Sequence, residues 1–376
     1  MHEIITDKTL QFYKDKKVLV TGHTGFKGSW LCEALLLAGA EVTGYSLEAP
    51  TDPNLFGLLD LSSRMNSITG DIRDRDHLMR VFDEVQPEIV LHLAAQPIVR
   101  DSYKDPVYTY ETNVLGTVNI CEAVRLHSCV KSFLNVTTDK VYLNREWDRG
   151  YVEDDPLDGY DPYSNSKSCS ELVTHSYINS FYKDMEVAVS TARAGNVIGG
   201  GDFANDRIIP DCVRAAMAGE TIGVRNPYST RPYQHVLEPI YMYLTIAKYQ
   251  YEDRKYQGYY NVGPDDCDCV TTGQLVDLFC EKWNAMSDNE QDANAGKMSW
   301  INQAEENAPH EAGFLKLDCS LAKKTFDWTP KWHIDQAVEK TVEWSKVYQK
   351  TCRGTEQDRD YIRDCVDGQI GEFLKA

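Results

Sequence analysis

The chain has 376 residues, 42% of them hydrophobic, a formal net charge of -19 and a pI near 4.9. This composition indicates a globular protein with a sizeable core, and its acidity argues against nucleic acid or an anionic membrane as a general partner. The polar N-terminus and the lack of a bilayer-length apolar run predict a cytoplasmic protein without membrane contact.

The eleven cysteines include no C-x-x-C pair. Cys267-Asp268-Cys269 comes nearest to a metal motif, but it has no second pair and no His close by in the sequence to complete a zinc site. We therefore expect reduced cysteines that serve in packing, and no bound metal.

A dinucleotide-binding turn is predicted near the start of the chain. The apolar run 17–21 leads into a glycine turn, and an amphipathic helix follows from about 29 to 38. Strand, glycine turn and helix in this order are the context that the dinucleotide motif requires, because glycines let the backbone approach a pyrophosphate at the helix N-terminus. The expected cofactor contacts here are Gly22, His23, Gly25, Phe26, Lys27 and Gly28.

The second and third strands, at 41–45 and about 65–70, bear on the choice of cofactor. An acid for the adenine ribose belongs near the end of the second strand, and Glu48 comes a little late for it. No Arg or Lys lies between Lys27 and Arg64 to meet a 2′-phosphate, so NAD is predicted rather than NADP. Asp71 and Ile72 end the third strand, where they either read the adenine or form an ordinary turn.

Further strands are expected at 89–95, 133–136, 186–193 and 258–263, with helices at 112–127 and 234–249. This alternation predicts an α/β fold, a doubly wound parallel sheet of the Rossmann type with a smaller, discontinuous C-terminal substrate domain. We assign residues 1–200 and 233–263 to the NAD-binding domain, and 201–232 and 264–376 to the substrate domain and a helical tail. Small residues after the fourth strand would let the cofactor lie close, and the expected contacts are Ala94, Ala95 and Gln96.

The stretch from Asn135 to Lys167 carries the predicted chemistry. Asp161 is a good N-cap and Pro162 suits the first helical position, so Tyr163 and Lys167 stand four apart on one helical face. A phenol with a pKa of about 10 is a poor base at pH 7, and an ammonium about 4 Å away would lower that pKa by roughly three units. Chance pairing is the alternative, and the glycine turn argues against it.

The run 137–140, Thr-Thr-Asp-Lys, follows the strand that ends near 136. Ligands lie beyond the carboxyl ends of parallel strands, so these residues are expected at the site. Arg207, Arg225, Arg231 and His235 lie in later loops and suggest an anion pocket for phosphates, with solvated surface arginines as the alternative.

Together these motifs resemble the extended short-chain dehydrogenase/reductase family and, more closely, its CDP-glucose 4,6-dehydratases. The resemblance covers about residues 17–332. Its specific parts are TGHTGFKGSW at 21–30, LAAQPIVR at 93–100, TTDK at 137–140 with NREW at 144–147, YDPYSNSK at 160–167, TARAGNVIGGGD at 191–202 and RPYQHV at 231–236. Two departures are the late Glu48 and Tyr233, which stands where we expect Trp.

The resemblance implies NAD-dependent conversion of CDP-glucose into CDP-4-keto-6-deoxyglucose, a precursor of deoxysugars in bacterial surface polysaccharides such as O-antigen. Carbon 4 of the sugar is oxidised, water is eliminated across carbons 5 and 6, and hydride returns to carbon 6. Tyr163 would be the base at carbon 4 and Thr138 would bind the 4-oxygen, while Lys167 holds the ribose. Asp139 fits the acid that releases the 6-hydroxyl. Lys140 stands where dTDP-glucose relatives have a Glu, and our hypothesis is that it removes the carbon 5 proton as a neutral amine while Asp139 is a neutral acid; the alternative is a lysine that only neutralises Asp139.

The resemblance also suggests a homodimer or homotetramer. Thr137 is expected beside the cofactor, with Tyr163 and Lys167, and Arg100, Asn196 and His310 beside the substrate. Two alternatives stay open. A nucleotide-sugar epimerase of the same fold would share Tyr163 and Lys167, but it needs no acid for a leaving hydroxyl. A non-catalytic NAD-binding sensor would have no use for a base.

Overall fold

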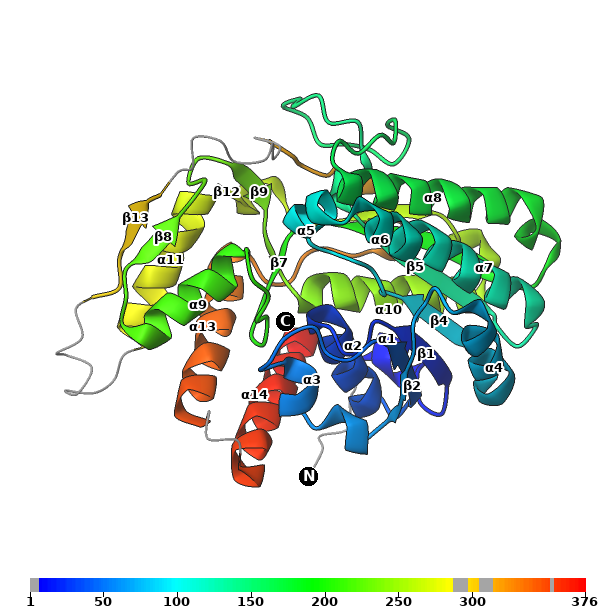
Figure 1. Cartoon of the computed structure of the whole chain (residues 1–376), viewed down its shortest axis with the longest axis horizontal. Coiled ribbons are helices and arrows are strands. Elements are labelled where there is room, and N and C mark those ends of the chain that lie inside the picture. The colour runs from blue at the N-terminus through cyan, green and yellow to red at the C-terminus, as the bar shows by residue number, and fades with distance from the viewer. Residues whose placement is uncertain (1–6, 287–296, 304–313, 352–354) are drawn as a thin grey trace.

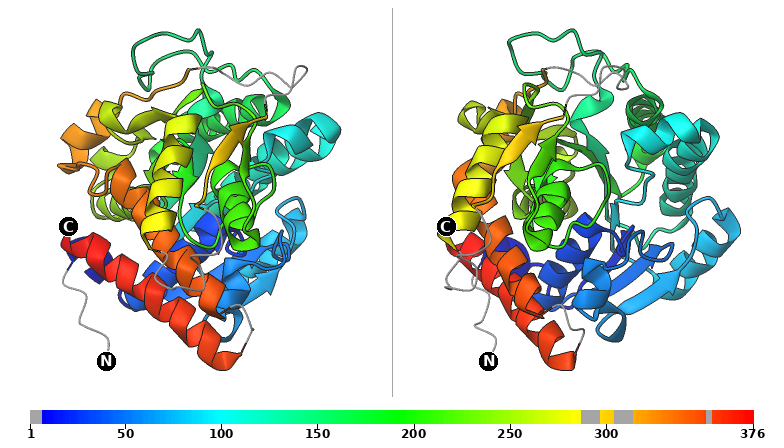
Figure 2. Two further views of the ribbon diagram at one scale, coloured as in Figure 1. Left: turned by 90° about the vertical axis from the view of Figure 1, so that its left-hand side faces the viewer. Right: turned by 60° about the vertical axis from the view of Figure 1, so that its left-hand side comes forward.

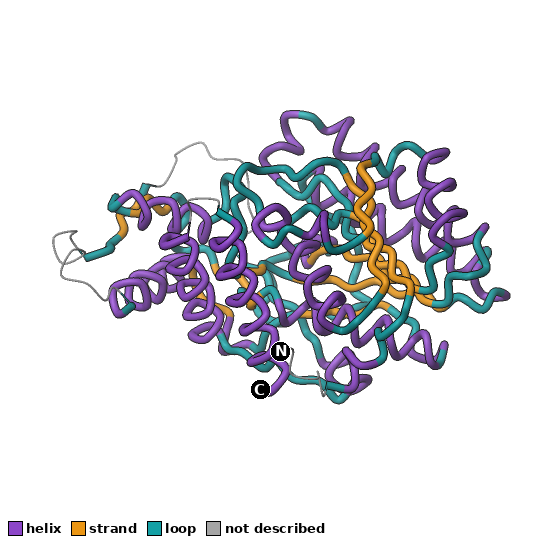
Figure 3. The backbone as a smooth tube through the Cα atoms, turned by 90° about the horizontal axis from the view of Figure 1, so that it is seen from below, coloured by secondary structure: helices purple, strands orange, loops and turns teal. Residues whose placement is uncertain are grey.

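The computed structural model describes residues 7–286, 297–303, 314–351 and 355–376. Its centre is a seven-stranded parallel sheet in the order β11-β6-β5-β4-β1-β2-β3, covered by helices on both sides (Figures 1 and 3). The strands are β1 (Lys17–Thr21), β2 (Glu41–Ser46), β3 (Asn66–Thr69), β4 (Ile89–His92), β5 (Ser132–Thr138), β6 (Ala188–Ala194) and β11 (Tyr259–Val262). The predicted doubly wound fold is therefore confirmed, with β11 returning to the sheet edge from late in the chain.

Alternate residues of the strands enter two different cores, because a parallel sheet is buried on both faces. Val18 and Val20 pack with α2 (Phe26–Leu37) and α10 (Leu237–Glu252), whereas Leu19 and Phe133 belong to the core on the opposite face. The helices of that opposite face are α4 (Arg75–Val85), α7 (Gly116–Leu126) and α8 (Pro162–Ser180). The helices on the two faces together fix the positions of the strand ends. The candidate site described below lies at the carboxyl ends of these strands.

A smaller unit stands at the left of Figure 1, with a core of its own. Its helices are α9 (Ile208–Ala218), α11 (Thr272–Ala285) and α13 (Ile334–Thr351). Three two-stranded sheets accompany them: β7 (Val197–Ile198) with β10 (Gln234–His235), β8 (Ile222–Val224) with β13 (Trp300–Asn302), and β9 (Thr230–Pro232) with β12 (Cys269–Thr271). The strand β9 brings Arg231 from this unit towards the sheet.

The remaining elements are short connections and a long last helix. The connections are α1 (Lys8–Gln11), α3 (Leu55–Leu58), α5 (Val99–Lys104), α6 (Pro106–Tyr110), α12 (Ser320–Phe326) and the single turns η1 (Leu61–Ser63), η3 (Asp139–Val141), η4 (Tyr182–Asp184), η5 (Arg254–Tyr256) and η6 (Asp266–Asp268). The last helix, α14 (Glu356–Lys375), lies along α13 and reaches α2 (Figure 2). None of the described helices is long and apolar enough to cross a membrane.

The helix expected at 112–127 differs from the prediction in its first turn. It begins with the π-helical turn η2 (Glu111–Leu115), and the regular helix α7 starts only at Gly116. The π turn buries Asn113, whose side chain donates to the carbonyl oxygen of Gln96 at 3.1 Å and to the hydroxyl of Ser166 at 2.9 Å. Single π-helical turns of this kind are rare and occur frequently at functional sites. Here the Asn113 side chain connects the segment after β4 to α8.

Candidate active site

A large cavity of about 1480 Å³ opens at the carboxyl edge of the sheet. The glycine turn after β1 and the ends of β4, β5 and β6 form one wall, and residues of α9, β8 and β9 form the other. A cavity at the carboxyl ends of parallel strands, between two units, is the usual position of a ligand in this architecture.

The glycine turn forms a cradle for a phosphate group. Gly22 has a φ of 76°, and a Cβ on Gly28 would lie 2.1 Å from the carbonyl oxygen of Gly22, so neither position accepts a side chain without rearrangement. Gly25 is the N-cap of α2 and offers no side-chain acceptor to the amides of the first helical turn. Gly22, Gly25, Phe26, Lys27 and Gly28 all line the cavity. The amides of Gly22 and Gly25 already donate to the carbonyl oxygens of Tyr45 and Gly22, so an anion here would be held by the amides of the first turn of α2.

His23 lies elsewhere, although we expected it at the cofactor. Its ring is fully buried between the hydroxyl of Ser46, at 3.0 Å from Nδ1, and the hydroxyl of Ser67, at 2.8 Å from Nε2. Burial lowers the pKa of His23 to about 4, so the ring is neutral. A Cβ on Gly44 would meet this ring at 2.2 Å, which explains the glycine in β2. His23 thus supports the turn from behind.

The far end of the cavity has an acidic edge. Glu48, two residues beyond β2, lines the cavity and accepts a hydrogen bond from Thr69 at 3.1 Å. Asp71 and Ile72 line it too, but the Asp71 carboxylate is paired with Arg73 at 2.7 Å, and hydrogen bonds from Arg73 lower the pKa of Asp71. Ala94, Ala95 and Gln96 continue the wall, with the Gln96 amide held by Thr109 at 2.9 Å.

Tyr163 and Lys167 both lie on the cavity wall and are almost fully buried. The predicted cap is confirmed, since the Asp161 carboxylate accepts the Ser164 amide at 3.0 Å and Pro162 opens α8. Lys167 donates through Nζ to the carbonyl oxygen of Val136 at 3.1 Å. The first turn of α8 is thereby fixed against the end of β5.

The expected lowering of the Tyr163 pKa is not found. Burial raises the pKa of Tyr163 to about 12, although a hydrogen bond with Thr138 and the charge of Arg207 oppose the rise. Burial also lowers the pKa of Lys167 to about 8, against the opposing charge of Glu171. Desolvation of both groups therefore outweighs the simple pair attraction that the spacing suggested.

Asp139 and Lys140 form a contact pair beside this phenol. Oδ1 of Asp139 accepts the Thr138 hydroxyl at 2.9 Å and the Lys140 Nζ at 3.2 Å, and that Nζ also donates to Asn196 at 3.2 Å. Oδ2 of Asp139 is buried and has no hydrogen-bond partner within the described part of the chain. Thr138, Lys140 and Asn196 line the cavity, whereas Asp139 is fully buried behind them. Asp139 is therefore connected to the cavity through its hydrogen bonds with Thr138 and Lys140.

Positive charge is concentrated at this end of an acidic protein. Burial, and then the charge of Arg207, lower the pKa of Lys27 to about 7, and Lys140 and Lys167 act in the same direction. Five of the expected substrate residues line the cavity: Arg100, Asn196, Arg207, Arg225 and Arg231. Anionic ligands would relieve the mutual repulsion of these cations.

One histidine that we expected in the anion pocket, His235, is not found there. His235 is fully buried between Trp30 and Trp332, and burial lowers its pKa to about 3, so it is a neutral core residue. Arg231, which stands four residues earlier in β9, does line the cavity. His310 lies outside the described residues.

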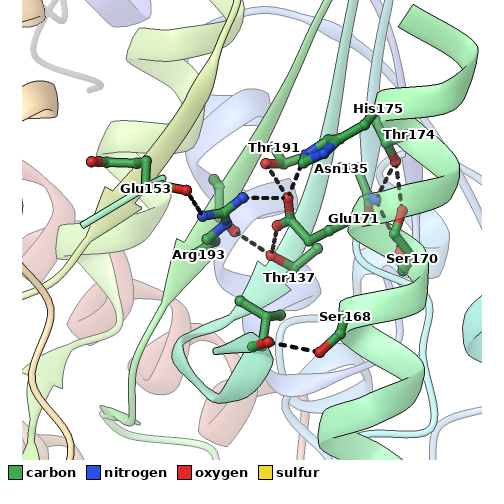
Figure 4. A network of polar contacts seen from close by, with 12 residues as sticks. Asn135, Thr137, Glu153, Ser168, Ser170, Glu171, Thr174, His175, Thr191 and Arg193 are labelled. Carbon is green, nitrogen blue, oxygen red and sulfur yellow. Dashed lines mark hydrogen bonds and ion pairs between the residues drawn. The ribbon is translucent and has the colours of Figure 1, made fainter. Parts of the chain in front are cut away.

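A buried ion pair that we did not anticipate joins α8 to β6 (Figure 4). Glu171 of α8 accepts Arg193 of β6 at 3.0 Å, Thr191 at 2.8 Å and the hydroxyl of Thr137, and His175 lies 3.2 Å away. Burial opposes ionisation of Glu171, yet Arg193 and the hydrogen bonds lower its pKa to about 2. Thr137 lines the cavity, but its hydroxyl is committed to this network.

The sequence held a signal for this pair. Arg193 is a charge inside an otherwise small and apolar strand, and Glu171 stands four residues beyond Lys167 on α8. A charge in a buried strand requires a partner, but which one it takes depends on how α8 packs across the sheet.

The geometry of the glycine cradle and the Tyr163–Lys167 wall agrees with comparisons to known proteins. The model of a protein family described as GDP-mannose 4,6 dehydratase matches residues 19–341. The chain belongs to this dehydratase family. The match begins inside β1 and ends within α13. It therefore covers the glycine turn, Tyr163 and Lys167 in α8, and Arg231 in β9.

Individual relatives agree with this family assignment. The chain is 47% identical to a CDP-glucose 4,6-dehydratase of Salmonella typhimurium, over 97% of this chain and 98% of that protein. A dTDP-glucose 4,6-dehydratase from Bacillus anthracis in complex with NAD is 21% identical, with a TM-score of 0.69 over 89% of this chain and 97% of that one. A UDP-glucose 4-epimerase from Thermus thermophilus in complex with NAD is 24% identical, with a TM-score of 0.72 over 88% and 98%. The two solved structures share the fold of the family with this chain.

Proposed function

We propose that this chain is an NAD-dependent hydro-lyase that converts CDP-glucose into CDP-4-keto-6-deoxyglucose. The observation that carries the proposal is that a phosphate cradle, a Tyr–Lys pair, the Asp139–Lys140 pair and an arginine cluster meet at one cavity. The choice of CDP-glucose rests on similarity along almost the whole chain to the Salmonella typhimurium enzyme.

The residues of the cradle fit NAD. The amides of the first turn of α2 would hold its pyrophosphate, the small Ala94 and Ala95 would pass beneath it, and Lys167 would bind the ribose next to the nicotinamide. Glu48 suits the hydroxyls of the adenine ribose and would repel a 2′-phosphate, which supports NAD over NADP. When bound, NAD accepts hydride from carbon 4 of the sugar and later returns it to carbon 6, and its oxidised ring adds positive charge near the phenol.

Tyr163 takes the proton of the sugar 4-hydroxyl. A buried phenol with a pKa of about 12 is protonated at pH 7, so it acts as a base only when positive charge and hydrogen bonds stabilise the phenolate. Thr138 supplies a hydroxyl to the same oxygen, and Arg207 supplies positive charge from the cavity wall.

Lys140 and Asp139 carry out the elimination. Lys140 faces the cavity and, as a neutral amine, would remove the carbon 5 proton, which the ketone at carbon 4 makes acidic, and so become an ammonium. Asp139, as a neutral carboxylic acid, would supply the proton for the leaving 6-hydroxyl. Since its carboxyl is buried behind the cavity lining, the Thr138 hydroxyl would take this proton from Asp139 and give its own to the leaving oxygen, which departs as water. Asn196 holds Lys140 from the other side.

The substrate contacts and the domain boundaries are the remaining assignments, and both rest on the division of the molecule into two units. Arg207, Arg225 and Arg231 would bind the nucleotide diphosphate, with Arg100 across the cavity. We keep His310, which lies outside the described residues, as a further substrate contact. We keep residues 1–200 and 233–263 as the NAD-binding domain and 201–232 and 264–376 as the substrate domain with its tail. The pairing of β9 with β12, in which Arg231 lies opposite Val270, joins the two segments of the proposed substrate domain and supports this division.

An epimerase is the nearest alternative because epimerases share the fold. The Asp139–Lys140 contact favours dehydration, since an epimerase has no hydroxyl to expel. A non-catalytic NAD sensor is disfavoured because it would not need Thr138 and Tyr163 in hydrogen-bond contact.

We also propose a homodimer or homotetramer that works in the cytoplasm and feeds deoxysugar synthesis for surface polysaccharides such as O-antigen. Large apolar side chains are exposed along α6, η2 and α8, namely Val107, Leu115 and Leu172, which suits a helical interface. The ten described cysteines are free, as in a reducing compartment. Light scattering of the purified chain would give the oligomeric state.

The test of the substrate is a competition among CDP-, UDP-, GDP- and dTDP-glucose in one reaction. Mass spectrometry would show loss of one water, and we expect the CDP-sugar to lose it first. Preference for another nucleotide would contradict the substrate assignment, and an isomer without water loss would indicate the epimerase.

A further inference from the structure

Three metal-binding side chains meet outside the cavity, at the start of α13. Cys267 and Asp268 belong to η6, and His333 stands immediately before α13. None of the three lines the cavity described above. The sequence lacked a His near Cys267-Asp268-Cys269, and the fold supplies one from 66 positions further along.

The three ligand atoms are already spaced for one ion. Oδ2 of Asp268 lies 2.9 Å from Nδ1 of His333, while Sγ of Cys267 lies 3.8 Å from that oxygen and 3.9 Å from that nitrogen. Around a tetrahedral zinc ion, with bonds of about 2.3 Å to sulfur and about 2.0 to 2.1 Å to nitrogen and oxygen, neighbouring ligand atoms are about 3.3 to 3.6 Å apart. Each edge is therefore within about half an ångström of its value in a zinc site.

We propose that Cys267, Asp268 and His333 bind a zinc-class divalent ion, with water as the fourth ligand. The combination of thiolate, imidazole and carboxylate selects zinc or cobalt over magnesium and calcium, which take oxygen ligands. The ion displaces the thiol proton and replaces the direct Asp268–His333 hydrogen bond.

The surroundings prepare the site. The second oxygen of Asp268 accepts the Ile334 amide at 2.9 Å, so the carboxylate is buried and fixed in orientation. Cys267 and His333 are exposed, which leaves a route for the ion and room for water. Asp265 and Asp266 add negative charge nearby, although Lys323 and Lys316 pair with them.

The position gives the ion a structural consequence. It would join η6 to the N-terminus of α13, directly before β12 begins at Cys269. Because β12 pairs with β9, and Val270 lies opposite Arg231, the ion would brace the strand pair that carries a proposed substrate arginine. The alternative is that Asp268 caps α13 and stabilises the β9–β12 pair without any metal, with the Cys267 thiol only lying nearby. The following experiment distinguishes a metal site from this cap.

The full-length protein, first treated with chelator, is titrated with Co²⁺ and followed by its thiolate-to-cobalt charge-transfer absorption. We expect one equivalent to bind with this absorption in the wild type and in the control Cys129→Ser, and no such absorption in Cys267→Ser. His333→Asn, which puts a residue favoured just before a helix at this position, should bind at least tenfold more weakly. Asp268 is left intact because it caps α13.

In parallel, Zn²⁺ should raise the melting temperature of the wild type and of Cys129→Ser but not of Cys267→Ser. NAD binding by each variant checks that it is folded. Absence of the absorption in the wild type, or its persistence in Cys267→Ser, would overturn the site, as would a zinc effect on melting that Cys267→Ser retains.

Discussion

Tyr163 is the residue on which the first half of the reaction depends. Its phenol is buried, touches Thr138, and has a pKa of about 12. Tyr163→Phe keeps the ring but removes the base, so we expect formation of enzyme-bound NADH after addition of CDP-glucose to fall by about 10²- to 10⁴-fold. Stopped-flow absorption of NADH measures this step.

The matched control is Tyr361→Phe, on the exposed side of α14, which should leave the burst unchanged. A normal burst of NADH in Tyr163→Phe would show that another group deprotonates the 4-hydroxyl.

Lys140 separates the two halves of the reaction. Its Nζ contacts Asp139 and Asn196 and faces the cavity, whereas the side-chain contact of Tyr163 is with Thr138. Lys140→Met should therefore still reduce bound NAD but stop before water is lost, and the carbon 5 proton should no longer exchange with deuterated solvent. Nuclear magnetic resonance of the recovered sugar gives the exchange, with the exposed Lys183→Met as the control.

Normal carbon 5 exchange in Lys140→Met would place the base elsewhere and leave Lys140 as a residue that only orients Asp139.

At the scale of elements, the Glu171–Arg193 pair fastens α8 to β5 and β6. Arg193→Met leaves a buried carboxylate without its cation, which costs roughly 3 to 5 kcal/mol of unfolding free energy. Adding Glu171→Gln removes the stranded charge, so the double variant should be more stable than Arg193→Met alone. Urea unfolding measures both.

Arg80→Met, an exposed arginine of α4, should change the free energy of unfolding by less than about 0.5 kcal/mol. If Glu171→Gln and Arg193→Met destabilise additively, the two side chains are not coupled as described.

Glu238 in α10 makes stability depend on pH. Its Oε1 accepts the amides of Lys331 and Trp332, at 2.8 and 2.6 Å, and burial raises the pKa of Glu238 to about 7. Between its ordinary pKa near 4.5 and about 7 the folded protein holds a proton that the unfolded chain has lost. Stability therefore falls as pH rises through this window, by about 3 kcal/mol in total.

Glu238→Gln imitates the protonated side chain, so the difference in unfolding free energy between variant and wild type should grow in favour of the variant from pH 5 to pH 8. A difference that stays constant over this range would contradict the raised pKa.

At the scale of the molecule, local patterns predicted what lies within one strand–turn–helix unit. The strand 17–21, the glycine turn, and the Asp161 cap with Tyr163 and Lys167 were all evident, because each depends on neighbours in the sequence. The direction of the Tyr163 pKa was not, since it is set by burial between two units.

Side-chain direction across the fold was the other failure. His23 and His235 stand within predicted motifs, yet both turn into cores, and Asp139 is hidden behind its neighbours. The contacts of Glu171 with Arg193, and of Cys267 with His333, were not predicted, because each forms only when distant segments of the chain pack together. These pairings depend on topology, which the spacing of residues along the chain does not encode.

The central claim is that one cavity performs oxidation at carbon 4, loss of water and reduction at carbon 6 on the same sugar. The most direct measurement uses CDP-glucose with deuterium at carbon 4, turned over together with unlabelled CDP-glucose. We predict a 4-keto-6-deoxy product that carries the deuterium at carbon 6 of the same molecule, with no mixing between labelled and unlabelled sugars. Deuterium that remains at carbon 4, or that is lost or exchanged between molecules, would contradict the account.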